Sequence, residues 1–271
     1  MGSILEWPQF HHTRMYISSH PRPAVSGAQN SESVRLWALI PCAGNGSRAG
    51  ATGPKQYQHV AGQPMVLHTL AAFSAVSRLA GVLVVVSAGD TFFDGYSLPC
   101  RVADCGGATR AHSVQNGLGA LQAWGAQPED WVLVHDAARC LITPALINML
   151  IDGCQNDAVG GLLALRLPDT LKRELGGRVA ETVGRTDKWL AQTPQMFRVG
   201  ALLQALQSAG GAVTDESSAL EALGHQPLLV EGSAQNFKIT YPADFALADA
   251  VLQSRRAMIT GAPRDTTGEH T

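Results

Sequence analysis

A glycine-rich stretch with two basic residues is the first part of the sequence that could bind a ligand. It covers Pro41–Gly50, and Lys55 follows shortly after it. Glycines let backbone N–H groups approach phosphate oxygens, and Arg48 and Lys55 can neutralise the phosphate charge. The stretch is no Walker A loop, because Pro54 stands before the lysine, and no GxGxxG fingerprint, because its third glycine comes too late. We expect a polyphosphate-binding loop of another kind; the alternative is a glycine-rich surface turn.

The charge around this stretch is locally positive although the whole chain is slightly acidic. The 271 residues carry 20 Lys and Arg against 22 Asp and Glu, a net charge of −2. No acidic residue lies between Glu32 and Asp90. Four basic residues lie in that interval: Arg35, Arg48, Lys55 and Arg78. A protein that wraps nucleic acid or coats an anionic membrane usually has an overall basic excess. The sequence therefore predicts a local polyanion site, with no nucleic-acid or membrane partner.

Two further segments carry polar side chains just after predicted strands. Asp104–Ser113 has paired glycines before Arg110 and Ser113, and these groups can contact the edge of a base, although an ordinary turn is an equal alternative. His135–Arg139 directly follows a buried strand and places Asp136 at its carboxyl end. A carboxylate there can hold a ribose or a metal beside a phosphate. The alternative is a helix cap with a salt-bridged arginine.

The elements that must position these segments alternate between strands and helices. Four apolar runs predict buried strands: Leu36–Ile40, Val82–Val86, Trp131–Val134 and Gly161–Leu167. Continuous apolar runs are typical of parallel strands that are covered on both faces. Apolar residues at helical spacing predict helices around Val66–Phe73, Val114–Leu121 and, after Thr143-Pro144, Leu146–Ile151. The predicted fold class is α/β, a Rossmann-like three-layer sandwich with a mostly parallel sheet.

The pattern changes after Leu167. Asp169–Lys188 is rich in charge, and two extended pieces flank Gly176-Gly177, which predicts a hairpin arm of about residues 168–190 that leaves the domain. The extended pieces are Thr170–Arg173 and Arg178–Val183. Helices are predicted over Val199–Ser208, over Asp215–Leu223 with Thr214 as cap, and from about Pro242 to Ser254. Short strands are predicted at Leu228–Val230 and Phe237–Thr240.

The two ends of the chain differ in composition from the part that we expect to fold. Residues 1–33 show no periodicity and no signal-peptide core, which predicts a flexible extension or a translation start nearer Met15. We expect one folded domain over residues 34–256 and a C-terminal tail over residues 257–271.

The longest apolar runs fall far short of the roughly 20 residues that span a bilayer. The five cysteines form no CxxC pair and no zinc-finger spacing, which indicates reduced thiols in a cytoplasmic protein.

Five motifs, in this order, carry a resemblance to one family. They are Pro-x-Ala-Gly-x-Gly-x-Arg with Pro-Lys-Gln-Tyr (Pro41–Tyr57), Val-His-Asp-Ala-Ala-Arg (Val134–Arg139), Gln-Thr-Pro-Gln (Gln192–Gln195), Thr-Asp-Glu (Thr214–Glu216) and Val-Glu-Gly…Asn-x-Lys-Ile-Thr (Val230–Thr240). Together they resemble the 2-C-methyl-D-erythritol 4-phosphate cytidylyltransferase family from about Arg35 to Arg255. The resemblance implies a nucleotidyltransferase that moves CMP from CTP to methylerythritol phosphate and releases pyrophosphate, in non-mevalonate isoprenoid biosynthesis.

The same resemblance implies roles for individual residues. The expected catalytic cations are Arg48, Lys55 and Lys238. The expected nucleotide-binding residues are Pro41, Cys42, Ala43, Gly44, Gly46, Gly107, Arg110, Ser113, Asp136 and Ala137. The residues expected to bind the acceptor phosphate are Thr170, Arg185, Arg139, Thr193 and Lys238. Mg²⁺ or another divalent cation is implied, bound mainly through the CTP phosphates, with Asp136 as its protein ligand. Thr170 and Arg185 lie on the arm, which in this family crosses to the partner subunit of a homodimer.

The chain departs from the family pattern at a few positions. Ala108 and Thr109 stand where the family commonly has an acidic pair, which bears on how base and sugar are selected. Gly184 precedes Arg185 where an aspartate is commonest. Cys42 stands where alanine is frequent, and we expect little effect because this position acts mainly through its backbone.

Two other functions remain open at this point. A sister enzyme that acts on another polyol phosphate, such as ribitol 5-phosphate, would use the same loop. A catalytically silent nucleotide-binding regulator would also retain it. A phosphate acceptor is already ionised near neutral pH and needs no general base, so we expect His135 to be structural. Thr214–Glu216 is expected to be mainly a helix start with acids facing the helix dipole.

Overall fold

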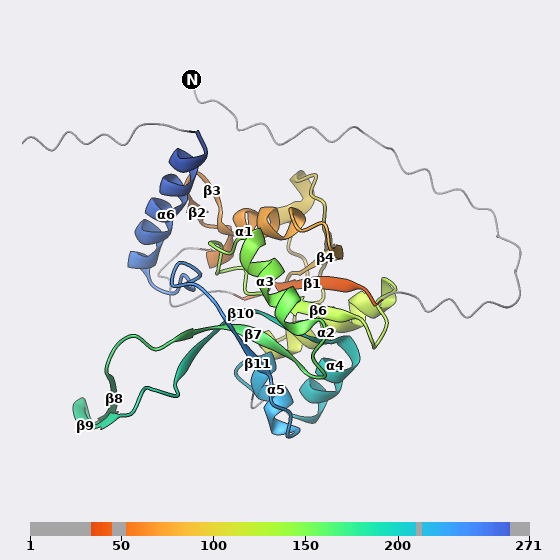
Figure 1. Cartoon of the computed structure of the whole chain (residues 1–271). Coiled ribbons are helices and arrows are strands. Elements are labelled where there is room, and N and C mark those ends of the chain that lie inside the picture. The colour runs from red at the N-terminus through yellow and green to blue at the C-terminus, as the bar shows by residue number, and fades with distance from the viewer. Residues whose placement is uncertain (1–33, 45–52, 210–212, 261–271) are drawn as a thin grey trace, which may run out of the picture. The chain divides into compact units, whose positions relative to one another are not determined.

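A seven-stranded sheet with the order β11-β7-β10-β6-β1-β4-β5 lies at the centre of the computed structural model (Figure 1). The chain divides into the units Met1–Ser33 and Val34–Thr271, and the structure describes residues 34–44, 53–209 and 213–260 of the second. The strands of the sheet are β1 (Leu36–Pro41), β4 (Leu79–Val85), β5 (Arg101–Ala103), β6 (Trp131–Val134), β7 (Gly160–Arg166), β10 (Trp189–Arg198) and β11 (Leu228–Glu231). Only β10 runs antiparallel to its neighbours, β6 and β7, and the other adjacent pairs are parallel. The predicted mostly parallel sheet is confirmed.

Helices cover both faces of this sheet. They are α1 (Met65–Ser74), α2 (Arg110–Ala123), α3 (Pro144–Cys154), α4 (Val199–Ser208), α5 (Glu216–Ala222) and α6 (Pro242–Thr260), with the short 3-10 helices η2 (Lys55–Tyr57) and η3 (Phe92–Gly95). A small hairpin of β2 (His59–Val60) and β3 (Gln63–Pro64) lies beside α6. Among the described residues, no helix is both long enough and apolar enough to cross a membrane.

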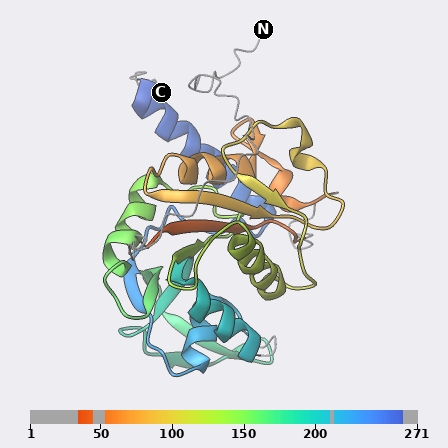
Figure 2. The ribbon, with the colours of Figure 1, turned by 90° about the vertical axis from the view of Figure 1, so that its right-hand side faces the viewer.

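The alternation of side chains along β1 explains the three layers. Ala38 and Ile40 face one side and pack in a buried cluster with residues of α1 and α3. Trp37 and Leu39 face the other side and pack in a second cluster with residues of α2, α4 and α5. Figure 2 shows α1 and α2 on opposite sides of the sheet. Both faces of the central strands are therefore buried, which is why these strands are apolar without interruption.

The predicted arm is a separate hairpin of β8 (Leu171–Leu175) and β9 (Arg178–Val183). Its turn contains Gly176 and Gly177, both at positive φ, which glycine adopts without steric cost. Figure 1 shows the hairpin extending away from the central sheet. Leu175 and Val179 near its tip are 72% and 65% exposed.

Several sequence predictions need correction. Phe237–Thr240 forms no strand: Ile239 N–H donates to the carbonyl of Ala138 at 2.9 Å, and the segment is a loop that packs on the chain after β6. Asp215, not Thr214, caps α5 and accepts from Ser218 N–H at 3.0 Å. The last helix continues to Thr260, so the predicted boundary after residue 256 falls inside it. The predicted N-terminal extension lies outside the described residues.

Two strands of the central sheet have no counterpart in the predictions. β5 is only three residues long and too short to show a pattern. β10 contains Gln192, Thr193 and Gln195, whose polar side chains hide its apolar alternation. All three are buried and hydrogen-bonded in the folded chain. The predicted cap of α3 is confirmed, because Thr143 accepts from Leu146 N–H at 3.3 Å.

Candidate active site

The polar segments that follow β1, β4 and β6 meet at the carboxyl edge of the sheet. These strands are parallel neighbours with Leu39 opposite Val134 and Ile40 opposite Val84. The loop of Pro41–Gly44 therefore begins beside His135 and Asp136. Open parallel sheets commonly bind ligands at this edge.

The first glycine-rich loop packs directly on the second. Ser87 Oγ donates to the carbonyl of Ala43 at 3.0 Å, and Gly106 N–H donates to the carbonyl of Val86 at 2.8 Å. A Cβ atom added to Gly106 would lie 2.4 Å from the Cβ of Ala43, so a side chain has no room there. The backbones of Pro41–Gly44 and Gly106–Gly107 thus form one continuous backbone wall at the carboxyl edge of the sheet.

Ser113 shapes this wall from inside α2. Its hydroxyl accepts from Gly107 N–H at 3.0 Å and donates to the carbonyl of Thr109 at 3.0 Å. Thr109, one of the departures from the family pattern, caps α2 and accepts from His112 N–H at 3.1 Å. The buried Ser113 therefore holds the loop in which a nucleotide base is expected to bind.

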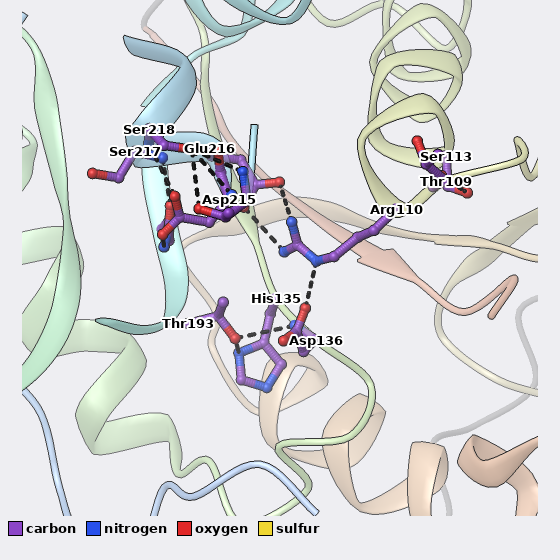
Figure 3. A network of polar contacts seen from close by, with 12 residues as sticks. Thr109, Arg110, Ser113, His135, Asp136, Thr193, Asp215, Glu216, Ser217 and Ser218 are labelled. Carbon is purple, nitrogen blue, oxygen red and sulfur yellow. Dashed lines mark hydrogen bonds and ion pairs between the residues drawn. The ribbon is translucent and has the colours of Figure 1, made fainter. Parts of the chain in front are cut away.

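Four charged side chains from four parts of the chain form one network, and Figure 3 shows three of them, Arg110, Asp136 and Glu216. Arg110 Nε donates to Asp136 Oδ1 at 2.7 Å, and its two terminal nitrogens donate to the carboxylate of Glu216 at 2.7 and 3.0 Å. Lys238 Nζ lies 2.7 Å from the other oxygen of Asp136. Asp136 thus stands between two cations, and Arg110 between two carboxylates.

The network keeps Asp136 and Arg110 ionised. Burial alone would raise the pKa of Asp136, but the charges of Arg110 and Lys238 lower it far below its usual range. Burial would likewise lower the pKa of Arg110, but Asp136 and Glu216 raise it above its usual range. The carboxylate and the guanidinium therefore remain charged at any physiological pH.

His135 is buried beneath the network and is neutral. Burial is the main reason that its pKa falls to about 3. Its Nε2 lies 3.2 Å from the carbonyl of Arg139, which can only accept, so this nitrogen carries the proton. Nδ1 is then the acceptor for the Thr193 hydroxyl, 3.0 Å away, and that hydroxyl in turn accepts from Asp136 N–H at 3.1 Å. This arrangement fixes the backbone of Asp136 and supports the structural role expected for His135.

A cluster of amide and guanidinium groups holds the loop that carries Lys238. The buried Asn236 donates from Nδ2 to the carbonyl of Thr193 at 2.9 Å. Arg139 donates to the carbonyls of Asn236 and Ala191 at 2.8 and 3.2 Å, and its buried Nε has no hydrogen-bond partner in the described part of the chain. Arg139 therefore joins the Lys238 loop to β10, because its two terminal nitrogens bond a carbonyl of each.

Lys55 comes to the same loop from the other side. Its Nζ donates to the carbonyl of Ile239 at 2.5 Å, one residue beyond Lys238. The next residue, Gln56, is buried and donates to the carbonyl of Cys42 at 2.7 Å, which fixes η2 against the glycine-rich loop. Two of the three predicted catalytic cations therefore converge; the third, Arg48, lies outside the described residues, as does Gly46.

Three members of this network, Arg110, Asp136 and Lys238, line a cavity of about 200 Å³ together with residues of β10 and of the segment before α5. Its wall includes Arg110, Asp136, Arg139, Thr193, Gln195 and Lys238. The arm residues Thr170 and Arg185 are exposed and do not line it, and the wall as described contains no residue of the arm.

Sequence reasoning missed three buried polar residues that support the site. Glu216 pairs with Arg110, Gln195 bonds both Asp215 and Ser217 N–H, and Asn236 docks the Lys238 loop. The motifs Gln-Thr-Pro-Gln, Thr-Asp-Glu and Asn-x-Lys contained them. The motif sequences do not show which side chains contact one another, because each contact joins segments far apart in the chain.

The donor set suits a metal held mostly by a substrate. The described residues contain no group of three or more His, Cys, Asp or Glu that could hold a metal ion. Asp136 and Asp215 each place a carboxylate at the wall of the cavity. One or two carboxylates together with substrate phosphates are a usual setting for Mg²⁺. The residues present therefore fit a phosphate-bound divalent cation.

Comparisons with known proteins agree on one family. The model of the 2-C-methyl-D-erythritol 4-phosphate cytidylyltransferase family (IspD) matches residues 36–254. The bifunctional enzyme IspD/IspF of Albidiferax ferrireducens is 67% identical over 230 residues; the match covers 84% of this chain but only 55% of that protein. The 2-C-methyl-D-erythritol 4-phosphate cytidylyltransferase of Paraburkholderia phytofirmans is 55% identical, covering 80% of this chain and 96% of the relative. A crystal structure of 4-diphosphocytidyl-2C-methyl-D-erythritol synthase superimposes with a TM-score of 0.72 at 40% identity, covering 82% of this chain and 100% of that one.

Proposed function

Because the chain belongs to the 2-C-methyl-D-erythritol 4-phosphate cytidylyltransferase family, a family of CTP-using nucleotidyltransferases, we propose how its residues perform the transfer. The observation that carries the proposal is the convergence of Lys55, Lys238, Arg110 and Asp136 at the carboxyl edge of the sheet. CTP lies along the backbone wall of Pro41–Gly44 and Gly106–Gly107. Its triphosphate faces Lys55 and Arg48, and the acceptor phosphate faces Lys238.

Charge repulsion is the obstacle that the site must overcome. The acceptor phosphate is already ionised, so no side chain has to remove a proton from it. Two unit charges at about 4 Å repel by on the order of 4 kcal/mol at an effective dielectric constant near 20. Fixed cations offset this repulsion, and they do so most where negative charge develops in the transition state. Lys55 and Lys238 are held in place before substrates bind, so they need little reorganisation.

Asp136 orients the cations and is a carboxylate available to a metal. Its two oxygens are bonded by Arg110 and Lys238, which leaves further N–H groups of Lys238 for a phosphate. A divalent cation on the CTP phosphates would add positive charge beside Asp136 when bound. Thr193 and Arg139 complete the wall on the acceptor side.

We assign the arm to a homodimer. Thr170 and Arg185 flank the hairpin, are exposed and do not line their own cavity, so they can serve the acceptor site of the partner subunit. The exposed Leu175 and Val179 near the tip give the arm apolar surface to bury on a second copy. All five cysteines are free thiols, which supports a cytoplasmic location for the enzyme.

A pyrophosphate-release assay tests the reaction. Purified protein is incubated with each of CTP, ATP, GTP and UTP and with methylerythritol phosphate or ribitol 5-phosphate, with and without EDTA. We expect release with CTP and methylerythritol phosphate, lost when EDTA removes the divalent cation. Preference for ribitol 5-phosphate would replace the acceptor assignment. Tight CTP binding without any release would identify a regulator instead.

A further inference from the structure

We propose that Glu216 is a positioning residue for this site: through Arg110 it sets the orientation of Asp136 and hence of Lys238. The inference rests on the proposed function. Glu216 is 1% exposed and does not line the cavity of Asp136 and Lys238. It lines a neighbouring cavity with Thr109 and Arg110, and its side chain is joined to the cavity of Asp136 and Lys238 through Arg110.

The hydrogen bonds that fix the start of α5 do not involve the Glu216 side chain. Asp215 caps the helix in a reciprocal capping box with Ser218. Gln195 of β10 donates to Asp215 Oδ2 at 2.8 Å and accepts from Ser217 N–H at 2.7 Å. These bonds tie the first turn of α5 to the central sheet, so the Glu216 carboxylate has a defined position.

From that position the Glu216 carboxylate accepts hydrogen bonds from both terminal nitrogens of Arg110. The two bonds, 2.7 and 3.0 Å, form the parallel bidentate geometry in which a guanidinium is most strongly oriented. The remaining nitrogen, Nε, then points at Asp136 Oδ1 at 2.7 Å. Figure 3 shows Arg110 reaching from α2 to both carboxylates. The rotation of the guanidinium is thus determined by Glu216, and it determines which oxygen of Asp136 is occupied.

The orientation of the Asp136 carboxylate in turn positions the ammonium group of Lys238. Because Arg110 occupies Oδ1, Oδ2 is left for Lys238 Nζ at 2.7 Å. The Lys238 side chain is partly exposed and lines the cavity, and among the described residues its Nζ pairs with Asp136 alone. Without the Glu216 charge, Arg110 has one carboxylate fewer to hold it, and it competes with Lys238 for Asp136 and with both lysines for phosphate oxygens.

The consequence is a loss of rate rather than of CTP binding. The added net positive charge beside the cavity favours a triphosphate in the ground state, while the misplaced Lys238 no longer matches the transition state. We expect Glu216→Gln to lower kcat by about 10- to 100-fold, the range for a sub-ångström to ångström displacement of a reacting group. KM for CTP should stay equal or fall.

The experiment compares Glu216→Gln and Glu216→Asp with Glu221→Gln. Glu221 is the matched control, because it lies on the same helix and is exposed, and its carboxylate accepts from the Ser217 hydroxyl and from no other group in the described part of the chain. Each variant is measured for kcat and for both KM values, normalised to the folded fraction from thermal unfolding. The Nε–H resonance of Arg110 in NMR reports the guanidinium orientation independently of activity. Glu221→Gln should match the original chain in all of these.

The outcomes separate this inference from the proposed function. A loss of kcat in Glu216→Gln with partial recovery in Glu216→Asp, and a shifted Arg110 resonance, supports it. Unchanged kcat per folded molecule, or a raised KM for CTP at unchanged kcat, overturns it. If the original chain itself releases no pyrophosphate, the proposed function fails, and an unchanged Arg110 resonance in Glu216→Gln would then overturn the positioning role as well.

Discussion

Lys55 donates a hydrogen bond of 2.5 Å to the carbonyl of Ile239, a residue 184 positions further along the chain. The contact places the lysine that follows the glycine-rich loop beside the loop that carries Lys238. It also explains why the segment after β11 is irregular: the carbonyl of Ile239 and the N–H of Ile239 are used by Lys55 and Ala138 rather than by a strand partner. One short loop thereby joins the proposed nucleotide side and the proposed acceptor side of the site.

Removal of either lysine should slow the chemical step. We expect Lys55→Ala and Lys238→Ala each to lower kcat by about 10²–10³-fold, the scale for one lost electrostatic donor. Steady-state pyrophosphate release measures this. Arg78→Ala is the control, because Arg78 pairs with the exposed Asp152 on the surface. A change in KM alone, with kcat intact, would contradict the assignment of these lysines.

Arg185→Ala should act on the acceptor and not on CTP. Loss of one charged hydrogen bond, about 1.5–3 kcal/mol, raises the acceptor KM by about 10- to 150-fold. Thr170→Ala should change it in the same direction. Equal effects on the two KM values would count against the arm as an acceptor-binding element.

Mixing two impaired variants, at acceptor concentrations below the raised KM of Arg185→Ala, tests whether the arm serves a second subunit. If Arg185 reaches the partner's cavity, Lys55→Ala and Arg185→Ala proteins should recover activity together in hybrid dimers, since one of the two sites then has both groups. Subunit exchange is verified first with differently tagged chains. Verified exchange without any recovery refutes the assignment.

Asp130 should make stability depend on acid pH. It accepts from the N–H groups of Arg35 and Gln127 and from Trp37 Nε1, and it pairs with the Arg35 guanidinium. Burial opposes its ionisation, but these bonds lower its pKa below the ordinary 3.8. Because the folded pKa is below the unfolded one, the stabilisation is complete above about pH 4 and is lost as pH falls through the folded value.

The measurement is the free energy of unfolding against pH. Asp130→Asn should cost about 1.5–3 kcal/mol at neutral pH, and its curve should approach that of the original chain in acid. Asp152→Asn, which removes a surface pair with Arg78, should cost less than about 1 kcal/mol. Parallel curves for Asp130→Asn and the original chain down to strong acid would show that Asp130 is not the titrating group.

Gly160 should not tolerate a side chain. Its φ is +104°, and a Cβ atom would lie 2.1 Å from the carbonyl oxygen of Met196 on β10. Gly160→Ala should therefore destabilise the fold by more than about 1 kcal/mol, whereas Gly119→Ala, in α2 with open space around it, should stabilise it by about 0.5–1 kcal/mol. Denaturant unfolding compares the two, and equal effects would rule out the close β7–β10 approach.

Local patterns sufficed where one segment carries its own signal. The apolar runs of β1, β4, β6 and β7 predicted their strands, and Thr143-Pro144 predicted the start of α3, because burial on both faces and helix capping act within a few residues. β10 was missed because the contacts that bury Gln192, Thr193 and Gln195 come from other segments. Lys238 was found from its motif, but its motif was read as a strand rather than a loop.

The sequence by itself determined that this is an α/β protein with cations after its first strand and a carboxylate after its β6 strand, because residue type and period reflect burial and local backbone geometry. Only the tertiary structure decided that Arg110 lies between Asp136 and Glu216. It also decided that Lys55 contacts the loop that carries Lys238, and that Arg139 donates hydrogen bonds to backbone carbonyls. Such contacts join residues up to 184 positions apart. Their geometry depends on how the packed layers bring the ends of strands together, and no local pattern contains that information.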